Sequence, residues 1–350
     1  MKIEHADPTA TIRARAPLRL GLAGGGTDVS PYCDSYGGLV LNATIDRHAY
    51  AVLRRSDEPR LRLEATDQQL QAELDPAAPL TEPGPLLLHR TVHRVMCDEF
   101  HGGVREALQL TTFCDAPVGS GLGASSTLVV AMLRAYAELW NLALDDYRLA
   151  QLAFRIERIE CALAGGRQDQ YSAAFGGFNF MEFYGGERTL VNPLRIRSWI
   201  KSELEASIVL FYTGVSRESA RIISDQSSGI AAGRADSLAA MHGLKLEAQT
   251  MKECLLRGDF DGIVNSLRQG WISKKASSAV VSNPLINAVY DAAIGAGALA
   301  GKVSGAGGGG FMLFFVPPER RMQVIRVLQG FDGQVSNCHF TDQGAQAWRI

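Results

Sequence analysis

Alternating hydrophobic and polar positions predict strands in several parts of the chain. Apolar and basic residues alternate over residues 12–22 and give way to glycines, as in a half-exposed strand that ends in a turn. Similar patterns predict a second strand within residues 37–56 and its hairpin partner near 60–66. We expect further strands at 107–117, 206–214 and 311–316.

Other segments repeat their apolar residues every three or four positions and predict helices. Leu128, Met132 and Tyr136 mark one buried face of a helix over residues 125–140. The remaining helices are expected at 86–99, 145–163, 217–227, 234–257, 259–271, 284–295 and near the C-terminal end. Because strands and helices do not alternate regularly, the fold class expected is α+β, with a second domain in the later half.

Composition narrows the possible partners. The 350 residues include 35 Lys and Arg against 37 Asp and Glu, so a net charge of −2 argues against nucleic acid binding. The six cysteines are spread singly without a CxxC pair, which is typical of reduced thiols in the cytoplasm. We find neither a signal peptide nor an apolar run long enough to cross a membrane, and expect a cytoplasmic protein without a membrane partner.

The segment PVGSGLGASS, residues 117–126, directly precedes the helix predicted at 125–140. A helix N-terminus attracts anions, and glycines let the backbone approach phosphate oxygens closely. A tight turn with a serine cap is the alternative interpretation. The expected phosphate-binding residues are Pro117, Gly119, Ser120, Gly121, Leu122, Gly123, Ala124, Ser125 and Ser126.

Two better-known phosphate loops fit this segment less well. A Walker loop needs a lysine after its last glycine, and no Lys or Arg occurs between Pro117 and Leu133. Gly119, Gly121 and Ala124 satisfy the dinucleotide pattern GxGxx(G/A). That pattern also requires a strand ending in an acidic residue after the helix, whereas a second helix is expected here, so a dinucleotide-dependent oxidoreductase is disfavoured.

The segment resembles the phosphate-binding motif of the galactokinase, homoserine kinase, mevalonate kinase and phosphomevalonate kinase (GHMP) superfamily. Two further signatures of that superfamily are present in the expected order along the chain. APLRLGLAGGGTD at 16–28 precedes the segment, and KVSGAGGGGF at 302–311 comes after it. Within the superfamily, segments such as GLAGGGTDVSPY and YTGVSRESARII are similar to bacterial sugar kinases that phosphorylate D-glycero-D-manno-heptose 7-phosphate at C1. The resemblance implies ATP and Mg²⁺ as cofactors and a step toward GDP-heptose for capsule or surface polysaccharide.

The resemblance also implies a domain organisation. Residues 1–195 would form an N-terminal ATP-binding domain of the ribosomal-protein-like α/β type. Residues 196–350 would form a ferredoxin-like C-terminal domain that completes the substrate site. A homodimer is possible, and the expected partners are ATP and a small sugar phosphate.

The resemblance assigns two catalytic residues. Asp169 lies in GGRQDQY, where an isolated Asp in a loop would otherwise be read as a turn former or helix cap. At the matching position in galactokinase-like sequences it would be the general base, or would orient the C1 hydroxyl. Arg19 matches an arginine beside that Asp, and its permanent charge would stabilise the developing alkoxide.

A magnesium site is assigned by the same resemblance to Ser126 and Glu157. The helical wheel over residues 145–163 places Glu160 closer than Glu157 to the apolar stripe that contains Leu149 and Leu152. Amphipathicity alone would therefore select Glu160. The spacing from Glu157 to Asp169 matches galactokinase-like sequences, so Glu157 is the residue we expect.

Sugar recognition is assigned to the first motif. Asp28 matches a sugar-binding Asp, and Gly25 stands where the galactokinase sequence GEHTD has Glu, which argues against galactose. The residues expected to bind substrate are Gly25, Gly26, Thr27, Asp28, Arg217 and Lys274. In the third motif, Gly305, Gly307 and Gly308 would lie beside the phosphates or the sugar, or would form a turn before the strand at 311–316.

The substrate's own phosphate would need basic partners. Arg217, Lys274, Lys275 and Arg167 are the candidates, and the sequence does not rank them. A C1 kinase of fucose or mannose stays open as an alternative. A non-catalytic sugar- or nucleotide-binding regulator is the other alternative, and such a chain would be expected to lack Asp169 or Ser126.

Overall fold

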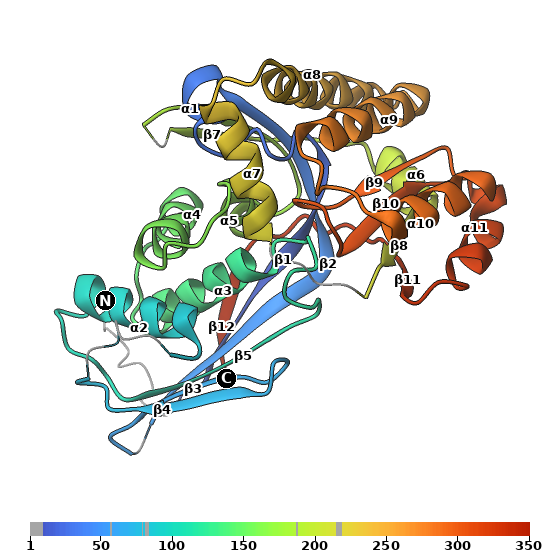
Figure 1. Cartoon of the computed structure of the whole chain (residues 1–350). Coiled ribbons are helices and arrows are strands. Elements are labelled where there is room, and N and C mark those ends of the chain that lie inside the picture. The colour runs from blue at the N-terminus through green and yellow to red at the C-terminus, as the bar shows by residue number, and fades with distance from the viewer. Residues whose placement is uncertain (1–9, 57, 79, 81–83, 187, 215–218) are drawn as a thin grey trace.

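A computed structural model of the protein describes residues 10–56, 58–78, 80, 84–186, 188–214 and 219–350 (Figure 1). An eight-stranded sheet forms its larger part, with strand order β12-β1-β2-β5-β3-β4 and with β6 on β2 and β7 on β6. The strands are β1 (Ile12–Ala23), β2 (Gly38–Arg55), β3 (Leu61–Ala65), β4 (Leu70–Leu74), β5 (Leu108–Cys114), β6 (Phe178–Phe183), β7 (Thr189–Pro193) and β12 (Gln346–Arg349).

Strand β2 is long because it has different neighbours at its two ends. It pairs with β1 along most of its length, with β6 over residues 38–43 and with β5 over residues 49–55. The expected hairpin between β2 and residues 60–66 is wrong. Strand β5 occupies that edge of β2, so β3 pairs in parallel with β5 and in antiparallel with β4.

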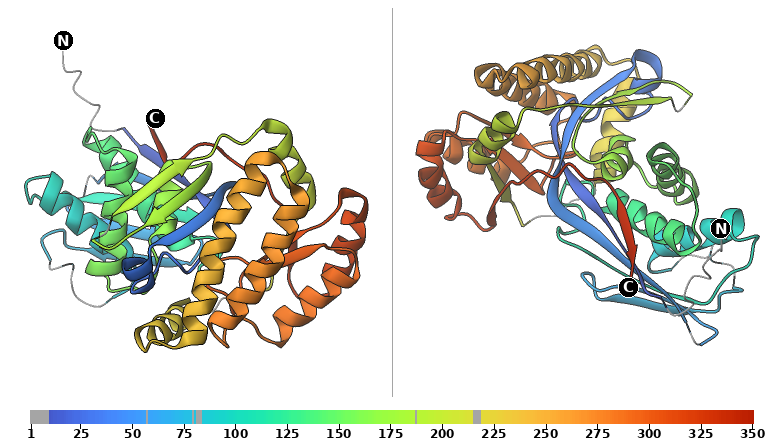
Figure 2. Two further views of the ribbon diagram at one scale, coloured as in Figure 1. Left: turned by 90° about the horizontal axis from the view of Figure 1, so that it is seen from above. Right: turned by 180° about the vertical axis from the view of Figure 1, so that it is seen from behind.

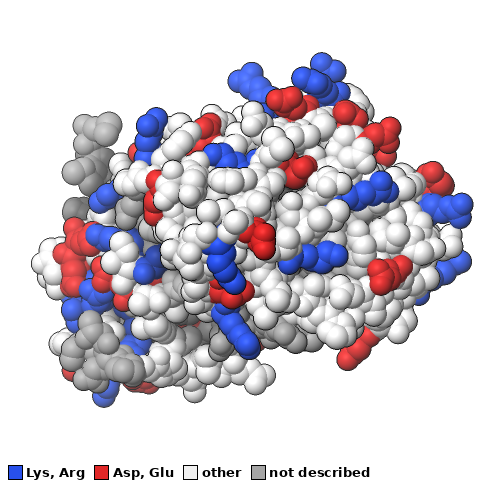
Figure 3. Space-filling view, turned by 45° about the horizontal axis from the view of Figure 1, so that its top comes forward, with Lys and Arg blue, Asp and Glu red and all other residues white. Residues whose placement is uncertain are grey.

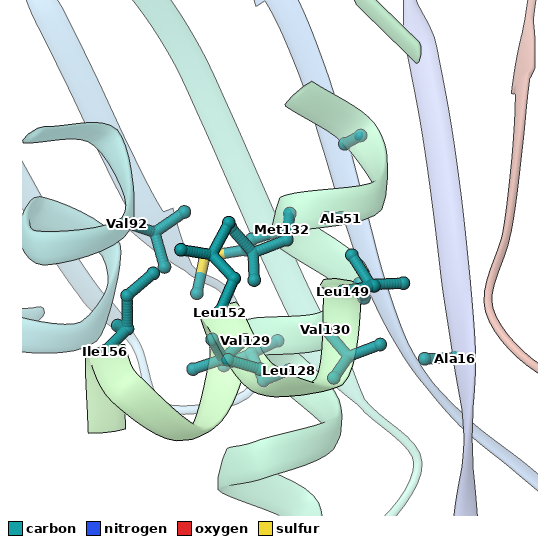
Figure 4. Packing of buried hydrophobic residues seen from close by; sticks show 14 of the residues in the cluster. Ala16, Ala51, Val92, Leu128, Val129, Val130, Met132, Leu149, Leu152 and Ile156 are labelled. Carbon is teal, nitrogen blue, oxygen red and sulfur yellow. The ribbon is translucent and has the colours of Figure 1, made fainter. Parts of the chain in front are cut away.

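Helices cover one face of this sheet and enclose the main core. They are α2 (Leu87–Phe100), α3 (Ala124–Leu139), α4 (Asp146–Arg155) and α5 (Gln168–Phe175). In Figure 4, Val129, Val130 and Met132 of α3 pack against side chains of α4 and the strands, and all three are fully buried. Apolar residues on both α3 and the strands beneath it therefore exclude water from this layer.

The second, smaller sheet is antiparallel with strand order β11-β8-β10-β9. It contains β8 (Ile208–Tyr212), β9 (Ala300–Val303), β10 (Phe311–Phe315) and β11 (Gln334–Asn337), with α6 (Ser198–Ser207), α10 (Pro284–Gly295) and α11 (Arg321–Leu328) near it. The order β8, helices, β9, β10, α11, β11 is that of the expected ferredoxin-like unit, and the mixed α/β fold is confirmed.

A third group of helices lies beside the end of β2. Helices α8 (Ala235–Arg257) and α9 (Phe260–Ser277) run side by side in Figures 1 and 2, while α1 (Tyr32–Tyr36) and α7 (Ser219–Ala231) lie near them. None of the helices in the described ranges has the length and apolar character needed to cross a bilayer. Basic and acidic side chains are interspersed over the face in Figure 3.

Most expected helices agree with the structure to within a few residues, and α10 agrees at both ends. The helix expected at 145–163 ends at Arg155 and continues as one π-helical turn, η1 (Ile156–Glu160). Helices α5 and α6 and the hairpin of β6 and β7 have no counterpart in the expectations. Strand β12 pairs with β1, so the last residues of 196–350 return to the sheet of 1–195.

Candidate active site

The three glycine motifs meet around one cavity of about 610 Å³, here called the central cavity. The first motif contributes the end of β1 and most of the turn at residues 25–29, and the second contributes residues 118–121 and 123–125. Lys302, Gly305 and Ala306 come from the third motif, and Arg158, residues 164–166, 168 and 169, and residues of α7 and α9 complete the lining. Segments far apart in the sequence thus build a single site.

The second motif, here called the phosphate loop, is fixed by its neighbours through backbone hydrogen bonds. The amide of Arg19 donates to Leu122 O (3.1 Å), and the amide of Phe311 donates to Ser120 O (2.8 Å). Gly121 has φ +80°, and a Cβ there would lie 2.5 Å from Ser304 O. Only glycine allows this close approach of the third motif to the loop.

The N-terminus of α3 opens toward the cavity. Its N-cap residue is Gly123, with φ +80°, and no side-chain cap hydrogen bond is made there. Gly123, Ala124 and Ser125 line the cavity. This arrangement favours a phosphate site over the serine-capped turn, because the helix dipole and the first-turn N–H groups face the space where an anion would lie.

Asp169 and Arg19 form a close ion pair at the cavity wall. Asp169 Oδ1 accepts a hydrogen bond from Arg19 Nε (2.7 Å) and lies 2.7 Å from Arg19 Nη2. Arg19 Nη1 donates to Gly121 O (2.6 Å), which links the pair to the phosphate loop. Asp169 lies in the first turn of α5, not in a loop as expected. A Cβ on Gly123 would lie 3.1 Å from the Asp169 carboxyl carbon, so the two segments are in direct contact.

Asp28 holds the helix that carries Asp169. Its Oδ2 accepts from the backbone amides of Arg167 and Gln168, and its Oδ1 accepts from Gly26 N and Gln168 Nε2. These four bonds, at 2.9–3.1 Å, occupy the acceptor sites of a carboxylate that is 1% exposed. Asp28 therefore caps α5 from a distance, and its expected bonds to sugar hydroxyls would have to replace protein ones.

The π-helical turn decides which glutamate faces inward. Glu157 is fully buried, whereas Glu160 is exposed and pairs with Arg94 at 2.7 Å. A π-turn adds one residue to the turn and rotates the residues that follow. The helical wheel, drawn for a regular helix, therefore favoured the wrong glutamate as the inward-facing one.

Ser125, rather than Ser126, meets Glu157. Ser125 Oγ donates to Glu157 Oε1 (2.9 Å) and lines the cavity. Ser126 is 1% exposed, and its Oγ accepts from Gln170 Nε2 (3.0 Å) and Arg158 Nη2 (3.4 Å). Gln170 Nε2 also donates to Glu157 Oε2. The serine hydroxyl expected beside Glu157 is thus supplied one residue earlier in the chain.

The basic candidates differ in their surroundings. Lys274 is buried and lines the cavity, whereas Lys275 is exposed with its ammonium 5.5 Å from the Trp271 ring centroid. Arg167 is held by Asp34 (3.0 Å) and by Tyr184 O (2.8 Å). Arg217 lies outside the described residues.

The site residues named in the sequence motifs or by the resemblance, together with Lys274, divide into those that line the central cavity and those that do not. Those that line the cavity are Arg19, Gly25, Gly26, Asp28, Gly119, Ser120, Gly121, Gly123, Ala124, Ser125, Asp169, Lys274 and Gly305. Those outside its lining are Thr27, Pro117, Leu122, Ser126, Glu157, Gly307 and Gly308. Thr27 is fully buried, and its hydroxyl joins the turn to Leu39.

The polar cavity residues that were not expected as site residues include Arg158, Gln168 and Lys302. Lys302 carried a usable signal, since a lysine inside a fully buried strand is rare unless it meets a partner. Arg158 and Gln168 carried none, because each is a common surface residue type within a helix or helix start.

Comparisons with known proteins identify the family of this chain. The sequence profile described as GHMP kinases N terminal domain matches residues 87–177, and that described as GHMP kinases C terminal matches residues 251–331. The chain is 45% identical to the D-glycero-alpha-D-manno-heptose 7-phosphate kinase of Campylobacter jejuni subsp. jejuni, over 97% of this chain and 99% of that protein.

Solved structures show the same relationship. A D-glycero-D-manno-heptose 1-phosphate kinase from Bacteroides thetaiotaomicron is 40% identical with a TM-score of 0.79, covering 97% of this chain and 99% of that one. Lactococcus lactis galactokinase, complexed with galactose, shares the fold at 17% identity and a TM-score of 0.75, with coverages of 98% and 96%. With both profiles matched and a relative this similar over almost its full length, the chain belongs to the GHMP kinase family.

Proposed function

We propose that this kinase transfers the γ-phosphoryl group of ATP to the C1 hydroxyl of D-glycero-D-manno-heptose 7-phosphate, giving the 1,7-bisphosphate and ADP. The observation that carries the proposal is the Arg19–Asp169 pair beside an uncapped helix N-terminus in one cavity. The 45% identical relative supports the choice of acceptor. The product would serve the synthesis of GDP-heptose and of capsule or other surface polysaccharide in the cytoplasm.

Asp169 would receive the proton of the acceptor hydroxyl. The hydroxyl oxygen forms a bond to the γ-phosphorus, the bond from that phosphorus to the bridging oxygen breaks, and ADP keeps the electron pair. Oδ1 of Asp169 is held by Arg19, which fixes the carboxylate so that Oδ2 can face the acceptor. The guanidinium also stabilises negative charge on the reacting oxygen.

The phosphate loop would hold the triphosphate. First-turn N–H groups at Ala124 and Ser125 and the dipole of α3 favour the negative charge that spreads over the phosphoryl oxygens during transfer. Catalysis of phosphoryl transfer depends mainly on such positioning and electrostatic stabilisation.

A magnesium ion fits the donor set next to the loop. A serine hydroxyl at the cavity surface with a carboxylate 2.9 Å behind it offers the oxygen ligands that Mg²⁺ prefers. Ser125 and Glu157 would hold the ion, which would neutralise charge on the phosphates. Among the described residues no cluster of three or more His, Cys, Asp or Glu side chains could hold a metal, so phosphate oxygens and water would complete the coordination.

The names of two relatives differ in the phosphate that the acceptor carries, at position 7 in one and at position 1 in the other. The same 1,7-bisphosphate would form from either acceptor, so the starting sugar phosphate must be varied. A 26% identical relative, the L-fucokinase/L-fucose-1-P guanylyltransferase of Bacteroides fragilis, makes fucose a further acceptor to compare.

An assay of ADP release with each acceptor tests the proposal. Heptose 7-phosphate, heptose 1-phosphate, mannose, fucose and galactose would be compared under identical conditions. We expect kcat/KM for heptose 7-phosphate to exceed that for mannose by about 10–100-fold, the factor for a charge-assisted contact to the second phosphate. Equal values for the two sugars would instead indicate a C1 kinase of free sugars, and turnover of none would indicate a binding protein.

A further inference from the structure

Two ammonium groups in the central cavity have no acidic partner. Lys274 of α9 is 4% exposed and Lys302 of β9 is 8% exposed, and both line the cavity. Lys302 Nζ donates to Gly21 O (2.6 Å) and Leu22 O (3.1 Å), while Lys274 Nζ donates to Gly25 O (3.3 Å). Within the described ranges, no carboxylate lies within 4.0 Å of either ammonium. We call these two residues the lysine pair.

Burial of like charges makes this arrangement costly without an anion. Burial lowers the pKa of Lys274 to about 8, and the nearby Arg19 adds to this effect. Burial lowers the pKa of Lys302 well below its usual range, with Lys274 and Arg19 contributing in the same direction. Asp28 favours the charged form of Lys274, but its oxygens already accept four hydrogen bonds from other residues. A ligand dianion in the cavity would relieve this repulsion.

We propose that the lysine pair binds the phosphate group that the acceptor sugar already carries, the one that does not react. This inference rests on the proposed function and adds the residues that select a sugar phosphate over a free sugar. It combines Lys274, one of several unranked candidates in the sequence, with Lys302, the first residue of the third motif, to which the sequence assigned no role.

The position of the lysine pair favours the acceptor over the nucleotide. Its carbonyl partners, Gly21, Leu22 and Gly25, belong to the first motif, whereas the phosphate loop and the N-terminus of α3 form a separate set of donors for ATP. Gly21 follows Arg19 by two residues in β1, or about 7 Å along a strand. A sugar with its C1 hydroxyl at Asp169 would span a comparable distance to its terminal phosphate.

Steady-state kinetics of Lys274→Met and Lys302→Met test the assignment. The measured quantity is the ratio of kcat/KM for heptose 7-phosphate to kcat/KM for mannose. We expect each substitution to lower this ratio by about 10-fold or more, because a charge-assisted contact is lost. Lys275→Met is the matched control, since its exposed ammonium is one residue away on the same helix, and it should keep the wild-type ratio. Lys302→Gln provides a second variant should Lys302→Met fail to fold.

Isothermal titration with heptose 7-phosphate in the absence of nucleotide provides a readout that a purely structural role would not move. We expect wild type and Lys275→Met to bind the sugar phosphate, and Lys274→Met and Lys302→Met to bind it at least about 10-fold more weakly. The KM for ATP should change much less.

Two results would overturn the assignment, and they are distinguishable. If wild type prefers heptose 7-phosphate and both lysine variants keep that preference while the KM for ATP rises, the lysine pair serves the nucleotide and the proposed function stands. If wild type shows no preference for heptose 7-phosphate over mannose, the proposed function and the lysine assignment are both contradicted.

Discussion

Two pairs of charged side chains in the central cavity differ in how their charges are balanced. Arg19 and Asp169 form an ion pair at 2.7 Å, and Arg19 is also bonded to the phosphate loop. Lys274 and Lys302, the lysine pair, bond only main-chain carbonyls among the described residues. The ion pair is assembled before any ligand arrives, as pre-organised catalysis requires, whereas the lysine pair gains its counter-charge only from a ligand.

Removing the carboxylate from the Arg19–Asp169 ion pair gives the largest expected effect. Asp169→Asn should lower kcat by about 10²–10⁴-fold, the range for loss of a general base, and should leave ATP binding largely intact. Turnover and equilibrium binding of ATP measure the two quantities. Asp291→Asn, on the exposed side of α10, is the control. Activity of Asp169→Asn within a few-fold of wild type would remove this residue from proton transfer.

Substitutions of two adjacent serines test the proposed magnesium site beside the phosphate loop. Ser125→Ala and Glu157→Gln should each raise the Mg²⁺ concentration for half-maximal activity by about 10-fold, because the hydroxyl and carboxylate oxygens are its protein ligands. Ser126→Ala and Glu160→Gln should not, since Ser126 bonds Gln170 and Arg158 and Glu160 pairs with Arg94. A larger shift for Ser126→Ala than for Ser125→Ala would restore the assignment made from the sequence.

A smaller effect is expected at the lysine pair, on the stability of the protein. Lys274→Met should raise the free energy of unfolding of the ligand-free protein at pH 7 by about 1–3 kcal/mol, because a buried charge is removed. Wild type binds fewer protons folded than unfolded between the folded pKa of about 8 and the usual 10.5, so its stability rises with pH in that window. Urea unfolding should therefore show the advantage of the variant shrinking from pH 7 to pH 10. If Lys274→Met is instead less stable than wild type at pH 7, the Lys274 ammonium is well solvated or paired.

The sequence and its resemblance named both members of the Arg19–Asp169 pair, but only Lys274 of the lysine pair. The phosphate loop combines glycines with a periodic apolar helix, and both signals are local in the chain. Arg19 and Asp169 are 150 residues apart, and only the resemblance to known kinases joined them. The helical wheel alone favoured Glu160 because η1 breaks the helical period, whereas the resemblance selected Glu157. The resemblance placed Ser126 beside Glu157, and in the structure Ser125 makes the hydrogen bond to it.

Strand pairing shows the same limit. The alternation of β3 predicts a strand but contains nothing that tells whether β2 or β5 is its neighbour. The role of Asp28 as a distant cap of α5 depends on contacts between residues 28 and 167–168, which no local pattern encodes. A lysine within a buried strand is unusual, and this was the signal for Lys302 in the sequence. That Lys302 and Lys274 line the same cavity is evident only in the folded structure, where α9 and β9 come together.

The central claim is tested most directly by following one turnover by phosphorus and proton NMR, with wild-type enzyme, ATP, Mg²⁺ and either heptose 7-phosphate or heptose 1-phosphate. With heptose 7-phosphate we predict one new phosphorus signal, coupled to the anomeric proton and equal in amount to the ADP formed, while the original phosphate stays in place. Heptose 1-phosphate should give no such transfer. A new signal coupled to any other sugar proton, or faster transfer to heptose 1-phosphate, would contradict the assignment of this enzyme as a C1 kinase of a sugar 7-phosphate.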